Sequence, residues 1–283
     1  MLQREIPWLE SSRPAIKPTT ISHIISHKTT MNLEQIWIER TTVNEKGNRV
    51  PTFWNPTPLS KIEGDTYDGN LMARIVSLGL VMELPVGELV TSQMRRIPGL
   101  NVGIVEKVLK SNISDEARHD KGMHYAEEFL TEAGYTVDTS PVYQFLKDTQ
   151  RLPYHPITLA ACLEVTLFLP MLALARMHGG QAFNRWALGI NEDEQRHVRV
   201  NSSLASALGE PLPTCHQWIP IRDAVIDYLM DGHPDKDLFY KASNELYNTC
   251  DSPTLNAIPI VSAVAFMAPF TVTNSEKYAR TVS

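Results

Sequence analysis

Several features are scarce in this chain. Its three cysteines, at positions 162, 215 and 250, match no metal-binding spacing and cannot all pair with one another. Unpaired cysteines are typical of reducing compartments, so we expect a cytoplasmic protein. No block of lysine and arginine stands out from the net charge of −6, which argues against a nucleic-acid partner. The N-terminus lacks the charged start and apolar run of a signal peptide.

Long apolar runs are also rare, and residues 156–175 are the exception. This stretch contains a single charged residue, Glu164. Its length would fit a membrane span, but a charge at mid-depth is costly there. A helix that is apolar on all sides also suits the centre of a large helical domain. We therefore expect a core helix and no membrane partner.

Strand patterns and internal repeats are missing too, whereas helical patterns are long. Four of them are bounded by Gly and Pro stop signals and cover residues 70–96, 102–132, 156–177 and 181–208. Short loops join the first to the second and the third to the fourth. Short connections make antiparallel neighbours, so the chain predicts two helical hairpins, the usual parts of a four-helix bundle.

The remaining segments predict a simple domain organisation. Residues 1–65 are rich in Pro, Thr and Ser and indicate an irregular arm packed on the body, with one short helix at 33–40. Residues 66–283 form the main domain, with its four-helix core at about 70–208. Additional helices are expected at 216–231, 236–249 and 254–270.

One motif occurs twice in the predicted bundle. Residues 115–119 read Asp-Glu-Ala-Arg-His and residues 193–197 read Asp-Glu-Gln-Arg-His. Glu and His three residues apart share one face of a helix, so both can reach one point. From this composition the motif is expected only about 0.0015 times by chance, which makes two copies in two hairpins hard to attribute to accident.

Bundle metal sites take one further carboxylate from each remaining helix, at the height of the partner motif. In the second hairpin, Glu164 and Glu194 each lie 15 residues from Gly179 in the turn. Glu164 is also the only acidic residue of its helix, and a carboxylate in so apolar a segment needs a partner or a metal.

In the first hairpin, Glu83 and Glu88 are rivals for the corresponding position. The midpoint of Glu83 and Glu116 falls inside the turn at residues 98–101, whereas that of Glu88 and Glu116 falls beyond it. Glu88 is also rotated about 140° from Glu83, at about 100° per residue. We therefore prefer Glu83.

The predicted site combines four carboxylates with two imidazoles. Its metal ligands are Glu83, Glu116, His119, Glu164, Glu194 and His197. Six such ligands from four helices suit two iron ions with open positions, and manganese would accept the same set. Zinc prefers four-coordinate sites that are richer in nitrogen or sulfur.

At this point the sequence resembles the ferritin-like di-iron carboxylate proteins. These include acyl-carrier-protein desaturases, bacterial multicomponent monooxygenases, arylamine N-oxygenases and ribonucleotide reductase small subunits. The resemblance covers about residues 70–208 and rests on the paired motifs. It implies an all-α fold: a ferritin-like four-helix bundle with additional C-terminal helices and an irregular N-terminal arm.

The resemblance also assigns roles by motif position. Glu83 and His119 would hold one iron, Glu164 and His197 the other, and Glu116 and Glu194 would bridge them, so these four glutamates are the expected catalytic carboxylates. The other ring nitrogens of the two histidines would bond to nearby acids, His119 to Asp193 and His197 to Asp115. Arg118 and Arg196 would neutralise those acids, or form ordinary surface ion pairs.

Two positions depart from individual branches of the family. Met123 stands where ribonucleotide reductase small subunits carry a radical tyrosine, four residues after the first motif's histidine. Ile190 stands where arylamine N-oxygenases carry an extra histidine.

The resemblance implies an enzyme that activates dioxygen to hydroxylate, N-oxygenate or desaturate a small apolar or aromatic substrate. Gly79 and Gly87 flank Glu83 by one turn and are expected to leave room for that substrate. Electrons would come from a reductase or ferredoxin, and a homodimer is compatible with the family. The alternatives are an iron-storage protein without catalysis, a ribonucleotide reductase small-subunit-like protein, and a metal-free helical interaction protein.

Overall fold

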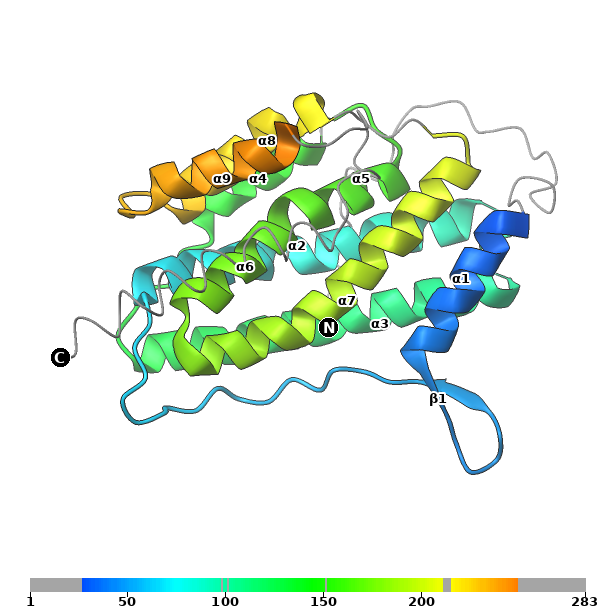
Figure 1. The fold of residues 1–283 in the computed structure, drawn as a ribbon, viewed down its shortest axis with the longest axis horizontal. Helices are drawn as coiled ribbons and strands as arrows, with labels where there is room; N and C mark the ends of the chain where they lie inside the picture. The colour runs from blue at the N-terminus through cyan, green and yellow to red at the C-terminus, as the bar shows by residue number, and fades with distance from the viewer. Residues whose placement is uncertain (1–26, 98, 101, 151, 211–214, 249–283) are drawn as a thin grey trace.

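The computed structural model describes residues 27–248 except 98, 101, 151 and 211–214. Within them the chain is mostly helical, with one pair of short strands. The long helices α2 (Gly69–Arg96), α3 (Gly103–Glu132) and α7 (Gly180–Ala207) pack lengthwise with the segment 156–178 (Figure 1). The prediction of an all-helical four-helix bundle is confirmed.

Helix ends form where the local chemistry favours them. Asp68 caps α2 by accepting a hydrogen bond from the Leu71 N–H at 2.9 Å. His155 similarly caps the third bundle segment through the Ile157 N–H, with Pro156 in the first turn. The α7 N-terminus is capped from a distance, because the Asp65 carboxylate accepts from the Gln181 N–H at 2.8 Å.

The third bundle segment is not a uniform helix. It runs as α5 (Pro156–Leu163), a π-helical turn η3 (Glu164–Phe168) and α6 (Leu169–His178). The π turn begins at Glu164, the acidic residue singled out from the sequence. Such turns insert an extra residue into a helix and are frequent at functional sites.

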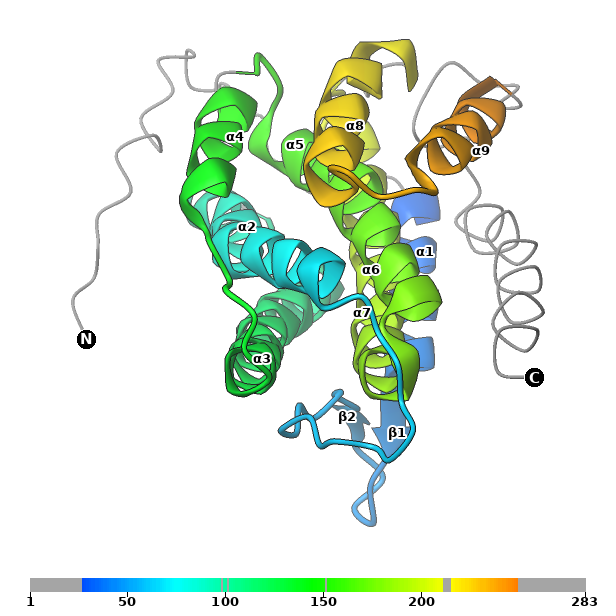
Figure 2. The same ribbon diagram turned by 90° about the vertical axis from the view of Figure 1, so that its left-hand side faces the viewer.

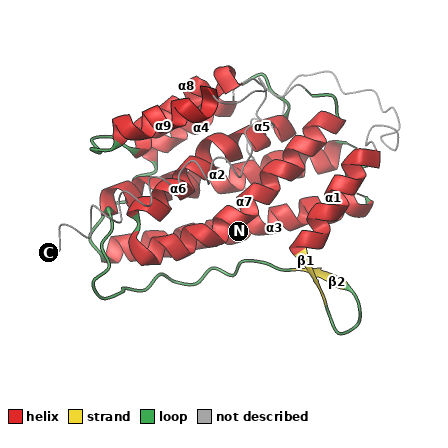
Figure 3. Cartoon of the chain, viewed as in Figure 1, coloured by secondary structure: helices red, strands yellow, loops and turns green. Residues whose placement is uncertain are grey.

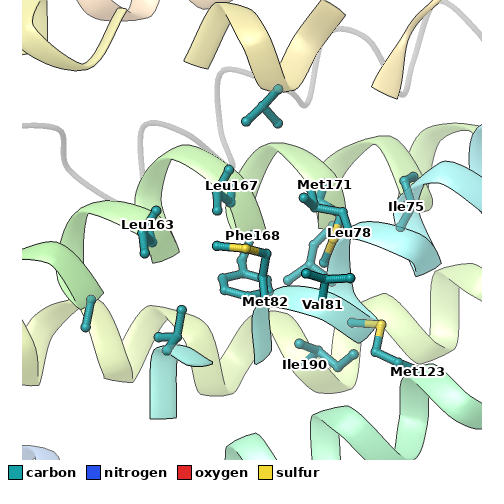
Figure 4. Close-up of a cluster of buried hydrophobic side chains, with 14 of the residues drawn as sticks. Ile75, Leu78, Val81, Met82, Met123, Leu163, Leu167, Phe168, Met171 and Ile190 are labelled. Carbon is teal, nitrogen blue, oxygen red and sulfur yellow. The ribbon is translucent and has the colours of Figure 1, made fainter. Parts of the chain in front are cut away.

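Buried apolar side chains from all four bundle segments form the core. Figure 4 shows part of this cluster, in which Met82 and Val81 of α2 meet Phe168 and Met171 of the third segment. Ile190 of α7 closes the cluster.

Three shorter helices lie over one side of the bundle (Figure 2). They are α4 (Ser140–Gln150), α8 (Cys215–Leu229) and α9 (Lys236–Asn248). The sequence predicted α8 and α9 but not α4, whose 11 residues lie in what was treated as a connection. The helix expected at 254–270 lies outside the described residues.

The N-terminal region is more regular than expected. Helix α1 (His27–Arg40) is longer than the predicted 33–40, and its Leu33 and Ile36 join the core. Two strands, β1 (Thr41–Val43) and β2 (Arg49–Pro51), pair antiparallel with Thr41 opposite Pro51 (Figure 3). An extended segment then follows the bundle to α2 (Figure 1). The boundary at residue 65 stays a prediction.

Two helices are long and apolar enough to cross a membrane, whereas the sequence had indicated only one. In Gly69–Arg96 and Pro156–His178, 72% and 88% of the most apolar window is buried inside the protein. Packing within the bundle therefore accounts for the apolar character of both.

Candidate metal centre

The two Asp-Glu-x-Arg-His motifs meet in the middle of the bundle. Glu116 and His119 project from α3 toward Glu194 and His197 of α7. The three positions other than Glu116 are fully buried, and Glu116 is 4% exposed. A cluster of carboxylates and imidazoles this deep in a protein is rare unless its groups are paired or bind metal.

The imidazole of His119 faces three carboxylates. Its Nδ1 lies 2.9 Å from Glu194 Oε1, 3.4 Å from Glu83 Oε2 and 3.9 Å from Glu116 Oε2. One ligand atom from each of these four residues lies within 4.8 Å of the others. They come from α2, α3 and α7, so the first half of the cluster needs three helices.

The imidazole of His197 faces a matching set. Its Nδ1 lies 3.1 Å from Glu116 Oε1, 3.7 Å from Glu194 Oε2 and 3.9 Å from Glu164 Oε1. Glu116 and Glu194 therefore present one oxygen to each imidazole, which is the arrangement that bridging carboxylates require. The two rings are 5.8 Å apart between centroids.

The structure places all six predicted ligands in one cluster. Glu88, the rival to Glu83, lies outside it and pairs with Arg95 instead. The geometry thus favours Glu83, while the role of each residue as a ligand stays a prediction.

Burial and mutual charge perturb the cluster strongly. Burial raises the pKa of both Glu83 and Glu164 well above the ordinary value, although the neighbouring imidazoles oppose this. Burial by itself would lower the pKa of His119, but the Glu83 and Glu194 carboxylates outweigh it and raise the pKa to about 10. Burial would raise the pKa of Glu194, yet the two neighbouring imidazoles outweigh it and lower the pKa to about 2.

Many polar atoms of the cluster lack a hydrogen-bond partner within the described chain. They include both carboxylate oxygens of Glu83 and of Glu194, one of Glu116, and Nδ1 of each histidine. Buried polar atoms are normally satisfied, so an orphaned set needs an explanation such as an ion. These atoms point at one another across two adjacent positions, and oxygen with imidazole nitrogen is a donor set that iron and manganese accept.

A second layer of acids orients the imidazoles. His119 Nε2 lies 3.2 Å from Asp193 Oδ2, and His197 Nε2 lies 3.3 Å from Asp115 Oδ2. Each acid thus comes from the opposite motif, as the sequence indicated. An Nε2–H that donates to a carboxylate leaves Nδ1 free to bind metal.

Of the two motif arginines, one meets its expectation and the other does not. Arg196 forms an ion pair with Asp193. Arg118 contacts neither acid: its guanidinium donates to the Ser114 carbonyl at 2.7 Å and lies 3.9 Å from the centre of the Phe53 ring. The proposed role of Arg118 in neutralising the second layer was therefore wrong.

The positively charged side chain that pairs with Asp115 comes from outside the four-helix core. Arg40, the last residue of α1, bonds to Asp115 and donates to Asp193 Oδ1 at 2.7 Å. It is 4% exposed and also donates to Ser111. Nothing in the spacing of the sequence pointed to Arg40, because it lies 75 residues before Asp115.

Asn201 was also missed, although its position carried a signal. Its side-chain amide donates to Glu164 Oε1 at 3.0 Å and approaches Oε2 at 3.3 Å. Asn201 follows His197 by four residues and so shares its helix face. Met123 holds the corresponding place after His119, and neither Glu83 oxygen has a hydrogen-bond partner among the described residues.

The two glycines beside Glu83 do not leave open space. A Cβ at Gly79 would fall 2.3 Å from the Met123 sulfur, and one at Gly87 would fall 3.1 Å from Glu116 Cγ. The room expected for a substrate is therefore taken by Met123 and by the Glu116 side chain. Gly87 lets a predicted ligand pass close to α2.

Fold and cluster together define a class: a helical-bundle protein with a buried carboxylate–histidine cluster that could bind metal. Comparisons with protein-family models, with curated proteins and with solved structures found no match.

Proposed function

We propose that this chain is a non-haem di-iron oxidoreductase that uses dioxygen to oxidise a small, largely apolar or aromatic organic molecule. The observation that carries the proposal is the buried cluster, in which Glu116 and Glu194 each face both imidazoles. One ion position in front of each imidazole, with Glu116 and Glu194 shared between the two, suits a pair of metal ions. The reaction would be a hydroxylation, an N-oxygenation or a desaturation.

The donor set supports iron. Glu83, Glu116, His119 and Glu194 would hold one ion, and Glu116, Glu164 and His197 would hold the other. Glu194 would also reach the second ion, because its Oε2 lies 3.7 Å from His197 Nδ1. Four ionised carboxylates balance the full charge of two divalent ions, and manganese is the alternative that the same donors accept. When bound, a pair of ferrous ions supplies the electrons and the open coordination positions for dioxygen chemistry.

The chain itself contributes orientation and exclusion of water. Asp115 and Asp193 hold the Nε2 atoms of the imidazoles so that both Nδ1 atoms face the cluster. The surrounding core, including Met82 and Phe168, is apolar and fully buried, which keeps bulk water from the reacting atoms.

Access for a substrate would depend on flexible side chains. Met123 is fully buried beside Gly79, between α3 and α2. Methionine is unbranched and changes rotamer more readily than Leu or Ile, so it suits a position that opens for a small molecule. An external reductase or ferredoxin would return the electrons spent in each turnover.

The proposal is tested by loading the metal-free protein with ferrous iron in the absence of oxygen and counting iron per chain. We expect two ions per chain. Admission of oxygen should then change the visible spectrum. Glu164→Leu and His197→Ala should each lower the iron count and abolish the spectral change.

Glu88→Leu is the matched control, because Glu88 lies on the same helix as Glu83 but outside the cluster. It should leave the iron count and the spectrum unchanged. Binding of no iron by the wild-type protein would refute the proposal. Iron that binds and oxidises without turnover of any amine, arene or acyl probe, in a shell-sized assembly, would instead establish the storage function.

A further inference from the structure

A second cluster of metal-type side chains lies at one end of the bundle, away from the centre. It consists of His178, the last residue of α6, together with His233 and Asp235 in the connection between α8 and α9. Asp68, at the start of α2, lies beside them. His178 follows Glu164 by 14 residues, or about 21 Å along a helix. The two clusters share no residue.

The geometry brings two imidazoles and a carboxylate to one point. A ligand atom from each of His178, His233 and Asp235 lies within 4.8 Å of the other two. The imidazole rings meet edge to face, with centroids 4.7 Å apart. Two imidazoles on one zinc ion, at about 2.0–2.1 Å from nitrogen to metal, have centroids about 4.5–5.5 Å apart. The rings already stand at that separation.

His178 has an unused donor atom in a buried position. The residue is 6% exposed, and its Nε2 has no hydrogen-bond partner within the described chain. An unsatisfied buried nitrogen is unfavourable without a ligand. Burial, followed by the neighbouring His233, lowers the pKa of His178, which keeps the ring in the neutral form that binds cations.

His233 is oriented from two sides. Its Nδ1 accepts a hydrogen bond from the Asp235 N–H at 3.1 Å, so in the neutral ring the proton sits on Nε2. That Nε2 lies 3.6 Å from Asp68 Oδ2. A carboxylate that accepts from the far ring nitrogen supports metal-binding imidazoles, and Asp68 lies just beyond hydrogen-bond distance from His233. A cation would take Nδ1 in place of the Asp235 N–H, with the Asp235 carboxylate next to it.

We propose that His178, His233 and Asp235 bind one divalent transition-metal ion of the zinc class, with Asp68 supporting His233 from behind. Two imidazoles and one carboxylate match the preference of zinc for four-coordinate sites, with water as the fourth ligand. The site differs in kind from the bundle centre, which has more oxygen donors and suits iron.

Such an ion would fasten the outer helices to the bundle. His233 and Asp235 belong to the connection between α8 and α9, whereas His178 and Asp68 belong to the bundle. Nearby, Arg74 of α2 donates to the Leu229 carbonyl at 2.8 Å, which is one direct bond between the two layers. Metal binding stabilises the folded state by an amount that grows with the logarithm of the free metal concentration relative to the dissociation constant.

The test is zinc binding by the full-length, metal-stripped chain, measured by equilibrium dialysis with elemental analysis. Wild type should bind one more zinc ion per chain than His178→Gln or His233→Gln. His124→Gln is the matched control, since His124 is an exposed histidine paired with Glu127, and it should behave as wild type. Zinc should also slow hydrogen exchange in residues 230–235 of wild type but not of the two variants.

Equal zinc counts in wild type and both variants, or exchange that does not respond to zinc, would overturn the proposal. If either variant fails to fold, Asp68→Asn replaces it, because Asn keeps the helix cap while removing the carboxylate behind His233. It should weaken zinc binding about 10–100-fold. Glu164→Leu separates the two sites: it should lose iron from the centre and keep this zinc ion.

Discussion

The two hairpins of the bundle carry the same motif but hold their outer carboxylates differently. Glu164 begins a π turn, and its carboxylate accepts a hydrogen bond from the Asn201 side chain. Glu83 lies in a helix with Pro85 two residues on, and neither of its carboxylate oxygens has a hydrogen-bond partner among the described residues. Met123 fills the space beside Gly79, one turn before Glu83. The paired motif therefore places its four glutamate and histidine side chains in the same way in both hairpins. The outer carboxylates differ: Asn201 holds Glu164 by hydrogen bonds, and no such residue holds Glu83 within the described chain. We call these the Glu164 half, or tight half, and the Glu83 half, or loose half. We expect the Glu164 half to bind its ion more firmly.

The largest effect should come from removing the cation that serves both halves. Arg40→Met leaves Asp115 and Asp193 without their shared partner and should destabilise the protein by about 3–5 kcal/mol. It should also weaken both metal positions. Thermal unfolding and iron counts check this.

Arg196→Met is the control for Arg40, because the ion pair of Arg196 is with Asp193 and not with Asp115. It should weaken mainly the His119 half, since Asp193 bonds to His119. If Arg196→Met weakened metal binding at the His119 and His197 positions as much as Arg40→Met does, Arg40 would have no special role in linking the two positions.

A somewhat smaller effect is expected from creating a cavity at Met123, in the Glu83 half of the cluster. Met123→Ala removes a fully buried side chain and should lower the free energy of unfolding by about 2–4 kcal/mol. Because the cavity lies beside Gly79, one turn before Glu83, the same variant should admit a small apolar probe such as xenon near the cluster. A destabilised variant that binds no probe would show that the space collapses.

The hydrogen bonds that hold Glu164 can be removed by a single substitution. Asn201→Leu removes the only side-chain hydrogen bonds to Glu164 among the described residues and should weaken metal binding in the tight half about 10–100-fold. Competitive chelation of the two ions in sequence measures this. If the more firmly held ion is unchanged, the difference between the halves has another source.

The most gradual effect is a dependence of stability on pH in the metal-free protein. The folded pKa of His119 is about 10, above its unfolded value, and those of Glu83 and Glu164 are also raised. The folded state therefore binds more protons, and stability falls as pH rises from 7 toward 10, by at most about 1.4 kcal/mol per unit for each proton. Bound metal replaces those protons, so the loaded protein should lose this slope. Chemical denaturation at several pH values tests both.

The bundle and the inner cluster could be predicted because they depend on regular helix geometry. Spacing of three residues places Glu116 beside His119, and equal distances from a turn place Glu164 opposite Glu194. The crossed contacts, Asp115 to His197 and Asp193 to His119, were predicted from motif position.

The rest depends on contacts between distant parts of the chain. Arg40 reaches the centre because α1 packs across α3 and α7, which no local pattern encodes. Helix α4 was missed because it lies in a stretch treated as a connection. The two glycines were misinterpreted because what fills a gap depends on a side chain from another helix, here Met123.

The π turn at Glu164 rotates α6 relative to α5 about the helix axis. An extra residue there shifts the two halves of the segment by about 100° in phase, so α5 and α6 present different rows of side chains to the same neighbours. A polar stripe continuous in sequence would be broken at that joint, whereas an all-round apolar surface tolerates the shift. Deleting one residue from 164–168 should therefore re-phase α5 against α6. The unusual apolarity of residues 156–175 is the composition that lets a helix change phase in mid-course.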